Sequence, residues 1–579
     1  MSELRQRKKD ATETQQDVSE VKATSEPKNQ LTSRGFYAII LFVIAFAAYQ
    51  YPSFIHDWLG LSESETLHGT RPDSIVDFSA DIFKRDAVVE AFKYAWAAYE
   101  RDAMGDDEYH PISHQGSNLT KPGGIGYTVV DSIDTMLIMG LPDEYERAKL
   151  WVANDMSFDR DAPFSTFETT IRVLGGLLAA YHLSGQDPLY LEKATELGNR
   201  ILPAFDTESG LPLSLVNLAE MEGVPDKDNS GMISTAEAAT LQLEFRYLAF
   251  LTDEDIYWEK AERVMAVIKQ ARMSHGLASI FMTQDGRFAT SAIRLGSRGD
   301  SYYEYLLKQY LQTNQTEGVY REMYDDAMTG IHDHLVQISP SSSLTYTAEL
   351  VPERKGQGLQ WRLVPKQDHL VCFLGGSLML GATTSGALVH PVSVPPRPEE
   401  LTEQGKRDWK TGIELIRTCM ATHDTQTGLS PEIAHFRTQN DNLEQLAHMP
   451  TDWYIKGARP GGPTPFDARY ILRPETVESL FIAFRLTGDV QYREYGWAIF
   501  NAIEKHCKLE SGGYAGVMNV DAVPVEHDDK METFLMSETL KYLYLLFADV
   551  KVLPLNEYVF NTEAHPFPVF MSNIRTGFS

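Results

Sequence analysis

Cysteine is scarce in this chain, and three cysteines among 579 residues exclude a scaffold held together by many disulfides. The sequence contains no Cys-x-x-Cys pair and no cluster of Cys and His, so nothing in it indicates a zinc site. Basic residues are also in deficit, because 52 Lys and Arg stand against 81 Asp and Glu and leave a formal net charge of −29. This negative charge repels phosphate backbones, and we expect no nucleic-acid partner.

Long uncharged runs are rare as well, and the clearest one lies near the N-terminus. Residues 35–49 read GFYAIILFVIAFAAY, and continuing to residue 55 gives 21 residues without a charge. A helix needs roughly 17–25 residues to cross a bilayer. Seven basic residues within 1–34 favour the cytoplasm for the side that precedes the run. A cleavable signal peptide fits less well, because 34 polar residues precede the run and no clear A-x-A site follows it.

The sequence therefore predicts four parts, which are a cytoplasmic tail at 1–34, a transmembrane signal anchor at 35–55, a lumenal stem at 56–80 and a large domain at 81–579. Hydrophobic residues make up 43% of the chain and charged residues 23%, which are the proportions of a globular protein. The length of the last part is sufficient for a large buried core.

Two features agree with a lumenal placement. Asn118-Leu-Thr and Asn314-Gln-Thr are N-glycosylation sequons, although so short a tripeptide also recurs by chance. An oxidising lumen would permit a disulfide, and the sequence alone leaves open which two of the three cysteines pair.

A weak internal repeat runs through the large domain. Segments that begin near residues 175, 243 and 478 each read as an apolar helical stretch, a short polar turn and a second amphipathic stretch. Gly185 and Gly488 suit left-handed helix ends. The spacing of these helical hairpins is irregular, which favours a closed barrel of paired helices over an open solenoid. We expect an all-α fold that brings side chains from distant helix ends into one central cavity.

Acidic residues recur in segments that are unlike ordinary solvated helix faces, because their neighbours are aromatic, hydroxylic or apolar. The pairs are Glu168 with Arg172, Asp300 with Glu304, Glu475 with Glu478, and Glu532 with Glu538. Taken singly, each acid is more often a structural residue than a catalytic one. Cleavage of a glycosidic bond needs two carboxyl groups, one to protonate the leaving oxygen and one to activate water or attack the sugar. Together these segments predict a glycoside hydrolase.

The same segments resemble glycoside hydrolase family 47, the class I α1,2-mannosidases, and the resemblance runs from about residue 84 to 567. The matching blocks are VVDSIDTMLIMG (129–140), FETTIRVLGGLLAAYHLSG (167–185), GDSYYEYLLKQY (299–310), HLVCFLGG (369–376), LRPETVESLFIAFRLTGD (472–489), METFLMSETLKYLYLLF (531–547) and FNTEAHP (560–566). The resemblance implies an (α/α)7 barrel that depends on Ca²⁺ and removes terminal α1,2-linked mannose from N-linked oligomannose with inversion. It makes 81–579 the catalytic domain.

By this resemblance, Glu168 is the general acid, acting through a water molecule, and Glu475 is the general base. Asp300 is a third catalytic carboxylate, and which of Glu168 and Asp300 donates the proton stays open. Thr562 corresponds to the calcium ligand. Cys372 and Cys419 correspond to the disulfide of the family, which leaves Cys507 unpaired. The remaining residues expected to contact substrate or to hold water are Arg172, Glu237, Arg298, His369, Arg473, Glu478, Phe534, Glu538 and Glu563.

One position bears on specificity. Arg298 stands where members of the endoplasmic reticulum (ER) type carry Arg and Golgi-type members usually carry Leu. We therefore expect an ER-type enzyme of fungal origin that trims Man9GlcNAc2 to one Man8GlcNAc2 isomer, as a monomer anchored in the ER membrane with type II topology. The alternatives are a Golgi-type enzyme that trims to Man5GlcNAc2 and a lectin-like ER degradation factor that binds oligomannose. Relatives of the last kind generally lack the cysteine pair.

Overall fold

The computed structural model describes residues 76–271, 275–356, 358–439, 441, 452–459, 462–574 and 576–578. The chain divides into two units, Met1–Ile75 and Val76–Ser579, and all described residues belong to the second. The predicted tail, the predicted anchor and most of the predicted stem lie outside the described residues. Within the described ranges, no helix is both long enough and apolar enough to cross a bilayer.

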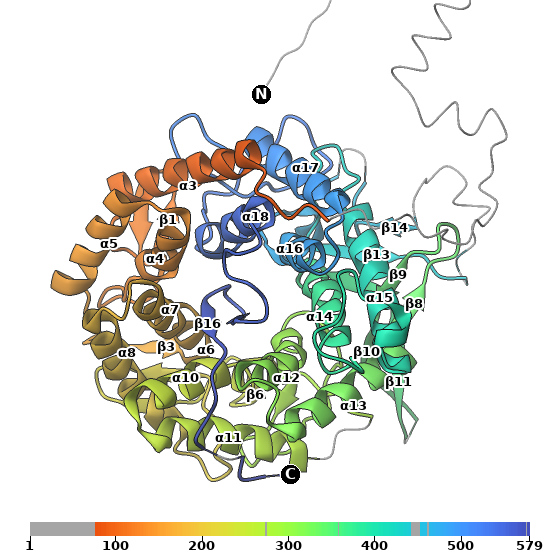
Figure 1. Ribbon diagram of the computed structural model, residues 1–579, viewed down its shortest axis with the longest axis horizontal. Helices are drawn as coiled ribbons and strands as arrows, with labels where there is room; N and C mark the ends of the chain where they lie inside the picture. The colour runs from red at the N-terminus through yellow and green to blue at the C-terminus, as the bar shows by residue number, and fades with distance from the viewer. Residues whose placement is uncertain are drawn as a thin grey trace, which may run out of the picture. The chain divides into compact units, whose positions relative to one another are not determined.

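The helices of the second unit pair along the chain, and the pairs follow one another around a closed ring (Figure 1). One helix of each pair faces the centre of the ring and its partner lies outside it. In the described part of the chain the pairs, inner helix first, are α4 (Tyr127–Met139) with α5 (Pro142–Asn154), α7 (Gly175–Leu183) with α8 (Pro188–Ile201), α10 (Gln242–Thr252) with α11 (Asp255–Gln270), α12 (Asp300–Gln312) with α13 (Gly318–His334), α14 (Phe373–Ala382) with α15 (Glu403–Ala421), α16 (Glu475–Thr487) with α17 (Val490–His506), and α18 (Leu540–Phe547) with α3 (Ile82–Ala103).

Inner and outer helices differ in how their side chains are buried. Every residue of α14 and of α18 is buried, as expected for helices that are enclosed on all sides. The outer helix α15 instead buries only one stripe, in which Asp408, Gly412, Leu415 and Cys419 recur at three- and four-residue spacing. The inner helices therefore form the wall of a central space and the outer helices separate that wall from solvent.

The three repeats predicted from the sequence are the pairs α7–α8, α10–α11 and α16–α17. Gly488 ends α16 with a φ of 67°, and Gly185 follows α7 with a φ of 78°, so both adopt the left-handed conformation that glycine permits. Asp489 then caps α17 by accepting a hydrogen bond from the Gln491 N–H at 2.9 Å. The turn chemistry read from the sequence is confirmed at these positions.

The described part of the chain is mostly helical, in agreement with the predicted helical fold, and it also contains short strands. Short antiparallel sheets of two or three strands lie between the helices. They are β1 (Glu108–His110) with β2 (Gln115–Ser117), β3 (Pro163–Ser165) with β4 (Leu215–Asn217) and β5 (Glu222–Val224), β6 (Ile233–Ser234) with β7 (Phe281–Met282), β8 (Val336–Ile338) with β9 (Thr345–Thr347), β10 (Glu349–Lys355) with β11 (Gly358–Val364), β12 (Lys366–Asp368) with β13 (Ile433–Phe436) and β14 (Trp453–Tyr454), and β15 (Tyr558–Phe560) with β16 (Pro566–Pro568).

Several short helices complete the described elements. Among them, η1 and η6 are π-helical turns, whereas η2 to η5 are 3₁₀ turns. Their bounds are α6 (Thr166–Glu168), η1 (Thr169–Leu174), η2 (Leu202–Phe205), α9 (Thr235–Ala238), η3 (His369–Cys372), η4 (Pro398–Glu400), η5 (Phe466–Ala468) and η6 (Leu535–Thr539).

The β15–β16 hairpin enters the middle of the ring (Figure 1). Phe560 pairs with Pro566 at the end of the ladder, so residues 561–565 form the turn. Ala564 adopts a φ of 59°, a left-handed conformation that is uncommon for a residue with a side chain. The hairpin therefore carries a tight, specifically built turn into the space that the inner helices enclose.

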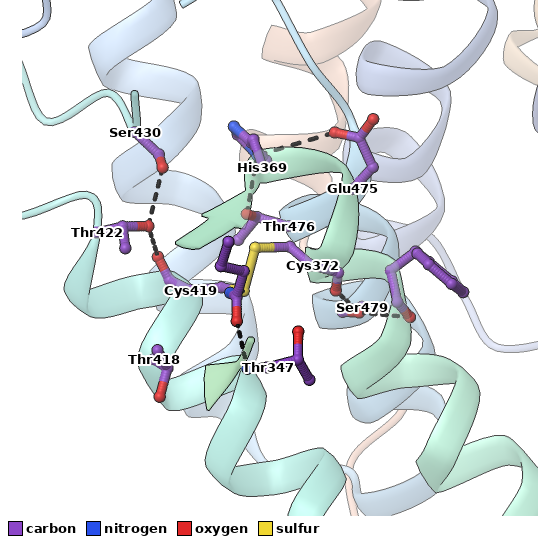
Figure 2. Close-up of a disulfide and its surroundings, with 12 residues drawn as sticks. Thr347, His369, Cys372, Thr418, Cys419, Thr422, Ser430, Glu475, Thr476 and Ser479 are labelled. Carbon is purple, nitrogen blue, oxygen red and sulfur yellow. Dashed lines mark hydrogen bonds and ion pairs between the residues drawn. A yellow bond between two sulfur atoms is a disulfide. The ribbon is translucent and has the colours of Figure 1, made fainter. Parts of the chain in front are cut away.

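One disulfide joins two neighbouring helical segments. Cys372 at the end of η3 bonds to Cys419 of α15, with the two Cα atoms 5.9 Å apart (Figure 2). Cys507 is buried and free. The pairing that the family resemblance implied is therefore confirmed. The bridge lies close to His369 and Thr476.

Candidate active site

A cavity of about 370 Å³ lies among the inner helices and is lined mainly by charged side chains. Twelve of the predicted site residues line it, namely Glu168, Arg172, Glu237, Arg298, Asp300, Arg473, Glu475, Glu478, Phe534, Glu538, Thr562 and Glu563. These residues come from positions almost 400 apart in the sequence, and closure of the ring brings them together. His369 is the exception, because it is buried behind Glu475 and does not line the cavity.

Glu168 and Arg172 form the side of the cavity that η1 provides. The Ser165 hydroxyl caps α6 by accepting a hydrogen bond from the Glu168 N–H at 3.2 Å. Arg172 Nε donates to Glu168 Oε2 at 2.8 Å, so the predicted four-residue pairing is present. The same guanidinium also contacts Glu563 and lies 3.5 Å from Asp131. Burial lowers the pKa of a guanidinium, but these carboxylates outweigh it and raise the pKa of Arg172 above its ordinary value.

Asp300 is the first residue of α12 and faces the cavity from another wall. Its carboxylate accepts a hydrogen bond from the Ser301 N–H at 2.8 Å. Burial, together with the nearby charges of Glu304 and Glu475, raises the pKa of Asp300 to about 7. A carboxyl group with this pKa is partly protonated at neutral pH and can either donate or accept a proton.

Glu475 begins α16 directly after Pro474. Arg473 Nη1 lies 3.4 Å from Glu475 Oε1, and the same guanidinium is fixed by Glu432, which accepts from Arg473 Nε at 2.8 Å. Burial raises the pKa of Glu475 to about 7, although Arg473 acts in the opposite direction. Among the described residues, no hydrogen-bond partner reaches Glu475 Oε2. That oxygen is buried, and His369 Nε2 lies 4.0 Å from it.

His369 supports Glu475 from behind. Its Nε2 lies 4.0 Å from Glu475 Oε2 and 3.0 Å from the Thr476 hydroxyl (Figure 2). Burial lowers the pKa of His369 well below the ordinary value, so the ring is neutral at physiological pH. Contact of this residue with substrate, expected from the sequence, is therefore replaced by a supporting position behind the carboxylate.

Phe534 lies between two of the cavity arginines. The guanidinium groups of Arg172 and Arg473 are 5.9 and 5.8 Å from the centre of its ring. Both distances are within the range of cation–π attraction, which holds the ring and the arginines in fixed positions. An aromatic ring that is fixed beside polar groups is a suitable surface for the apolar face of a sugar.

Arg298 and Glu237 lie on the same wall as Asp300. Arg298 Nη1 donates to Glu237 Oε1 at 2.9 Å, and its guanidinium lies 5.2 Å from the ring centre of Phe281. Arg298 adopts a φ of 69°, which is uncommon for a residue other than glycine. Non-glycine residues in this region of φ concentrate at functional sites, where surrounding contacts hold them. Leu472, beside Arg473, has a similar φ of 73°.

Thr562 lies at the deep end of the cavity, in the turn of the β15–β16 hairpin. Its hydroxyl donates to Glu304 Oε2 at 2.8 Å. Glu478, Glu538 and Glu563 line the same cavity. Burial raises the pKa of Glu478 to about 7, and burial raises the pKa values of Glu538 and Glu563 well above the ordinary range. The charge of Glu563 adds to the rise at Glu538, and the charges of Asp131 and Glu168 add to the rise at Glu563.

The side chains that face this end of the cavity offer oxygen atoms as ligands and carry more acidic groups than cations. Lys308 contacts Glu304 and lies 3.5 Å from Glu478. Across the described part of the chain, no group of three or more His, Cys, Asp or Glu side chains is spaced to hold a metal ion by itself. Any cation here would therefore complete its coordination shell with main-chain oxygens, water or ligand hydroxyls.

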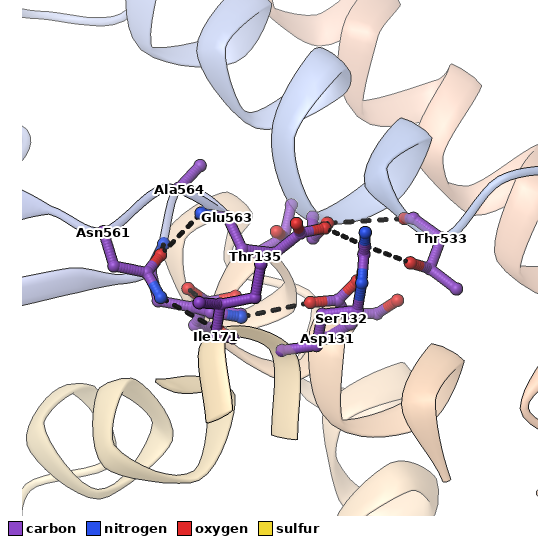
Figure 3. A network of polar contacts seen from close by, with 12 residues as sticks. Asp131, Ser132, Thr135, Ile171, Thr533, Asn561, Glu563 and Ala564 are labelled. Atoms are coloured by element: carbon purple, nitrogen blue, oxygen red, sulfur yellow. Dashed lines mark hydrogen bonds and ion pairs between the residues drawn. The ribbon is translucent and has the colours of Figure 1, made fainter. Parts of the chain in front are cut away.

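A buried network holds the hairpin turn against η1 (Figure 3). Asn561 Oδ1 accepts hydrogen bonds from the N–H groups of Glu563 and His565, at 2.9 and 2.8 Å. Asn561 Nδ2 donates to the Ile171 carbonyl at 2.9 Å and to Glu244 Oε1 at 2.7 Å. One amide side chain thus fixes the turn that carries Thr562 and ties it to the π turn beside Glu168.

A cluster of fully buried charged side chains packs against this turn, and the sequence alone did not predict it. His565 contacts Asp134 Oδ2 through Nδ1 at 2.9 Å and Asp131 Oδ1 through Nε2 at 3.1 Å. Lys541 Nζ donates to Asp134 Oδ2 at 2.7 Å and to the Ala564 carbonyl at 2.8 Å. Burial alone would lower the pKa of His565, but the two aspartates raise it, so the ring donates from both nitrogens.

Both π turns lie in the wall of the cavity. Each presents a main-chain carbonyl to a side chain of another element: Ile171 to Asn561, and Met536 to the Thr135 hydroxyl, which donates at 3.0 Å. π turns inside helices are rare and are frequent at functional sites. Here they coincide with the segments that carry Glu168 and Glu538.

Comparison with known proteins shows which family has this sequence pattern. The sequence profile of glycosyl hydrolase family 47 matches residues 91–569. A mannosyl-oligosaccharide 1,2-alpha-mannosidase of Candida albicans is 42% identical over 552 residues, which cover 93% of this chain and 90% of the relative. The endoplasmic reticulum mannosyl-oligosaccharide 1,2-alpha-mannosidase of Schizosaccharomyces pombe is 41% identical over 512 residues, which cover 87% of this chain and 93% of the relative.

A solved structure agrees with the sequence relatives. The α-1,2-mannosidase from Trichoderma reesei matches with a TM-score of 0.72 and 28% identity, covering 85% of this chain and 100% of that one. The profile match spans most of the described unit and includes every residue that lines the acidic cavity. The chain therefore belongs to glycosyl hydrolase family 47 and is a glycoside hydrolase.

Proposed function

We propose that this glycoside hydrolase is an exo-α1,2-mannosidase that removes terminal mannose from N-linked oligomannose glycans in the endoplasmic reticulum, and that its helical ring is an (α/α)7 barrel. The observation that carries the proposal is the cavity in which Glu168, Asp300 and Glu475 meet. The names of the two fungal relatives supply the substrate class and, in one case, the compartment. A cavity closed by inner helices and a hairpin suits an enzyme that acts on the end of a chain.

The proposed reaction inverts the configuration at the sugar. Glu475 accepts a proton from water, and the water oxygen attacks C1 as the C1–O bond to the next sugar breaks. A base with a pKa of about 7 is ionised often enough at neutral pH to act and still binds a proton effectively. The Glu475 side chain lines the cavity, so a water molecule held there would lie within its reach.

The leaving oxygen receives its proton on the other side of the cavity. Glu168 acts there through a water molecule, and Asp300 is the alternative donor. Asp300 is partly protonated at neutral pH because of its raised pKa. Arg172 orients Glu168 by the hydrogen bond at 2.8 Å, and Phe534 offers a surface on which the sugar packs. The proposed donor and the proposed base come from different segments that line one cavity, which supports this division of roles.

Calcium fits the deep end of the cavity. Ca²⁺ binds six to eight oxygen atoms, and the groups that face this end, Thr562 and the three glutamates at 478, 538 and 563, supply oxygen alone. Burial is the main cause of the raised pKa values of these glutamates, and neighbouring carboxylates add to it; a divalent cation would relieve that repulsion. Thr562 would bind the ion directly, through its hydroxyl and carbonyl oxygens, and the glutamates would hold the water around it. The bound ion would orient sugar hydroxyls and polarise them.

The proposed product is a single Man8GlcNAc2 isomer. Arg298 can hold several hydroxyl groups in one orientation, because a guanidinium presents its donors in a rigid plane. Its hydrogen bond to Glu237 and its contact with Phe281 fix the direction of that plane. The catalytic carboxylates and the disulfide favour an enzyme over the lectin-like alternative.

The proposed setting is the ER lumen, with the enzyme monomeric and anchored by residues 35–55 in type II topology. A disulfide between Cys372 and Cys419 is compatible with an oxidising compartment. The substrate would then be N-linked oligomannose on glycoproteins within the same compartment.

The test is incubation of the full chain, in detergent, with Man9GlcNAc2 and Ca²⁺, followed by separation of the products by isomer. We expect one Man8GlcNAc2 isomer to accumulate, and we expect a calcium chelator to stop its formation until Ca²⁺ is restored. Progress to Man5GlcNAc2 would assign Golgi-type specificity instead. Glycan binding without release of mannose would contradict the enzymatic proposal and favour the lectin-like reading.

A further inference from the structure

The asparagines of both sequons are exposed, and they differ in the contacts of their side chains. Asn314 follows the end of α12 and is exposed, in a turn where Asn314 and Gln315 have φ values of 52° and 61°. Its side-chain Nδ2 is 3.5 Å from the Met571 sulfur, which is a weak acceptor. The Asn314 amide therefore has no strong hydrogen bond that a modification would have to break.

A hollow of about 380 Å³ opens beside Asn314, and Asn314 itself is part of its wall. Tyr558, Phe570 and Met571 supply apolar surface, while Asn556 and Glu557 supply polar groups. Met571 is 60% exposed, so its side chain is accessible to a group bound in the hollow. A surface that combines aromatic, aliphatic and polar groups suits a sugar, which presents apolar C–H faces and polar edges.

Asn118 is held more firmly. Its Nδ2 donates to Asp106 Oδ1 at 2.8 Å, and its Oδ1 accepts from the Asp107 N–H at 3.2 Å. The amide also packs so closely on Gly124 that a Cβ atom there would lie 2.1 Å from Asn118 Oδ1. The next residue, Leu119, lines a second hollow that also reaches Glu168. A glycan on Asn118 would therefore disturb a built loop close to the active site.

We propose that Asn314 carries an N-linked oligosaccharide whose first N-acetylglucosamine is seated in the hollow beside it. This inference rests on the proposed lumenal placement, where the sugar donor, a lipid-pyrophosphate-linked oligosaccharide, is available. In the transfer, a bond forms between Asn314 Nδ2 and C1 of the sugar as the bond from C1 to the pyrophosphate oxygen breaks. Nδ2 gives up one proton, the lipid pyrophosphate leaves, and no group is oxidised or reduced.

The position of the site keeps the glycan away from catalysis. Asp300 is the first residue of α12, and Asn314 follows its other end. Thirteen helical residues at about 1.5 Å each separate the two ends by roughly 20 Å. An oligosaccharide on Asn314 therefore starts at the far end of an inner helix from the catalytic carboxylate and leaves the cavity open.

The seated sugar would also stabilise the packing of the segment around Phe570 against the ring. The Phe570 N–H donates to the Gln312 carbonyl at 2.9 Å, and the Phe570 ring stacks on Phe250 with centroids 4.3 Å apart. Sugar packed between Asn314 and Met571 would cover the exposed edge of this contact. The glycan therefore stabilises the docking of the segment around Phe570 onto the end of α12.

The first experiment tests occupancy of Asn314 in the full chain, expressed in a eukaryotic cell that glycosylates secreted proteins. Treatment with a peptide N-glycosidase should increase the mobility of the wild-type protein on a denaturing gel. Asn314→Gln and Thr316→Ala should remove this shift, whereas Thr316→Ser keeps the sequon and should retain it. A shift that persists in Asn314→Gln and disappears in Asn118→Gln would overturn the proposal.

The second experiment tests the seating. Trimming the native glycan to its first N-acetylglucosamine should leave the Tm unchanged, whereas Asn314→Gln should lower the Tm by about 2 °C. In the Met571→Ser background, loss of the glycan should lower the Tm by less than half as much. An equal loss of Tm in both backgrounds, or no loss in either, would refute the seating in the hollow.

Two further measurements separate this inference from the proposed function. Asn314→Gln should hydrolyse Man9GlcNAc2 at the wild-type rate, because it lies outside the cavity. Protease treatment of sealed microsomes reports the lumenal placement independently. An active enzyme that the microsomes protect from the protease but that carries no glycan on Asn314 would overturn this inference alone. Digestion of the catalytic domain by the protease would overturn the lumenal placement as well.

Discussion

Glu475 is the residue on which the proposed chemistry depends most. Burial raises its pKa, Arg473 Nη1 lies 3.4 Å from one of its oxygens, and the other oxygen has no hydrogen-bond partner among the described residues. A buried acid and an unpaired buried oxygen both lower the free energy of unfolding, because water solvates a carboxylate better than a protein interior does. They are understandable if the residue holds and deprotonates a water molecule.

Replacement of Glu475 by Gln should abolish turnover while retaining glycan binding, because the amide keeps the size of the carboxylate but cannot accept the proton. General bases contribute roughly 10²- to 10⁴-fold, and we expect a fall in kcat of at least 10²-fold. The measurement is the rate of mannose release together with calorimetric titration of Man9GlcNAc2.

The matched control is Asp408→Asn. Burial also raises the pKa of Asp408, to about 6, but this residue lies on the outer helix α15 and does not line the cavity. Its rate should stay within twofold of the wild type. Near-normal turnover of Glu475→Gln would remove this residue from the role of base.

The raised pKa of Glu475 also predicts how stability depends on pH. A glutamate in the unfolded chain ionises near 4.3, whereas the buried group in the folded protein ionises near 7. Between these values the folded state binds a proton that the unfolded state has lost, so the stabilisation present below about pH 4.3 is lost as the pH rises to about 7. Glutamine does not titrate, so the Glu475→Gln variant does not lose stability in this way as the pH rises.

The stability of Glu475→Gln relative to the wild type should therefore increase from pH 5 to pH 8, by up to about 3 kcal/mol. Denaturant unfolding of both proteins at the two pH values, in the presence of a chelator, measures this difference. A difference that is the same at pH 5 and pH 8 would show that the pKa of Glu475 is not raised.

Arg298 is the residue to which we attribute branch selection. Arg298→Leu removes the guanidinium that contacts Glu237, and the products should extend beyond one Man8GlcNAc2 isomer. Arg287→Leu is the control, because Arg287 is 80% exposed and its salt bridge is to Asp285 on the surface. Chromatographic separation of isomers decides the matter, and an unchanged profile for Arg298→Leu would refute the attribution.

At the scale of elements, the helical pairs could be predicted and the details that make the site could not. Periodicity and the glycines at 185 and 488 were sufficient for the paired helices, because these signals are local. The π turns at η1 and η6 have no local signature, and their carbonyl groups accept hydrogen bonds from Asn561 and Thr135, which are distant in the sequence. Similarly, the position of His369 behind Glu475 depends on packing of η3 against α16.

The network of Asp134, His565 and Lys541 lay beyond sequence reasoning for the same reason. Asp134 and Lys541 are 407 residues apart, and only the folded ring shows that they pair. The acids in the family blocks were identified, but their partners were not. A charge at a position with apolar neighbours signals a buried partner without saying which residue supplies it.

This network gives a prediction about stability. Lys541→Met leaves Asp134 buried with His565 as its remaining charged contact, and loss of one partner from a buried ion pair costs about 3–5 kcal/mol. Lys410→Met is the control, because Lys410 is 78% exposed and its pair with Glu414 should contribute at most about 1 kcal/mol. Denaturant unfolding compares the two, and equal losses would show that the buried network does not carry this stability.

At the scale of the whole molecule, the active site exists only when the ring is closed. Glu168 and Glu563 meet through Arg172 although they belong to opposite ends of the domain sequence. The contact of α18 with α3 completes the ring, and the β15–β16 hairpin brings Thr562 into its centre. The sequence could predict a central cavity lined with acids, because the periodicity indicated a closed barrel and the acids lie in segments unlike solvated helix faces. It could not predict the volume of that cavity or which acids face each other.

The central claim is that this cavity hydrolyses an α-mannosidic bond with inversion, Glu475 acting as the base on water. The most direct measurement is the proton NMR spectrum of mannose released in the first minutes of reaction, before the anomers equilibrate. The account predicts that β-mannose appears first and then converts slowly to the mixture. Initial release of α-mannose would show retention of configuration and would contradict the assignment of Glu475 as a base that activates water.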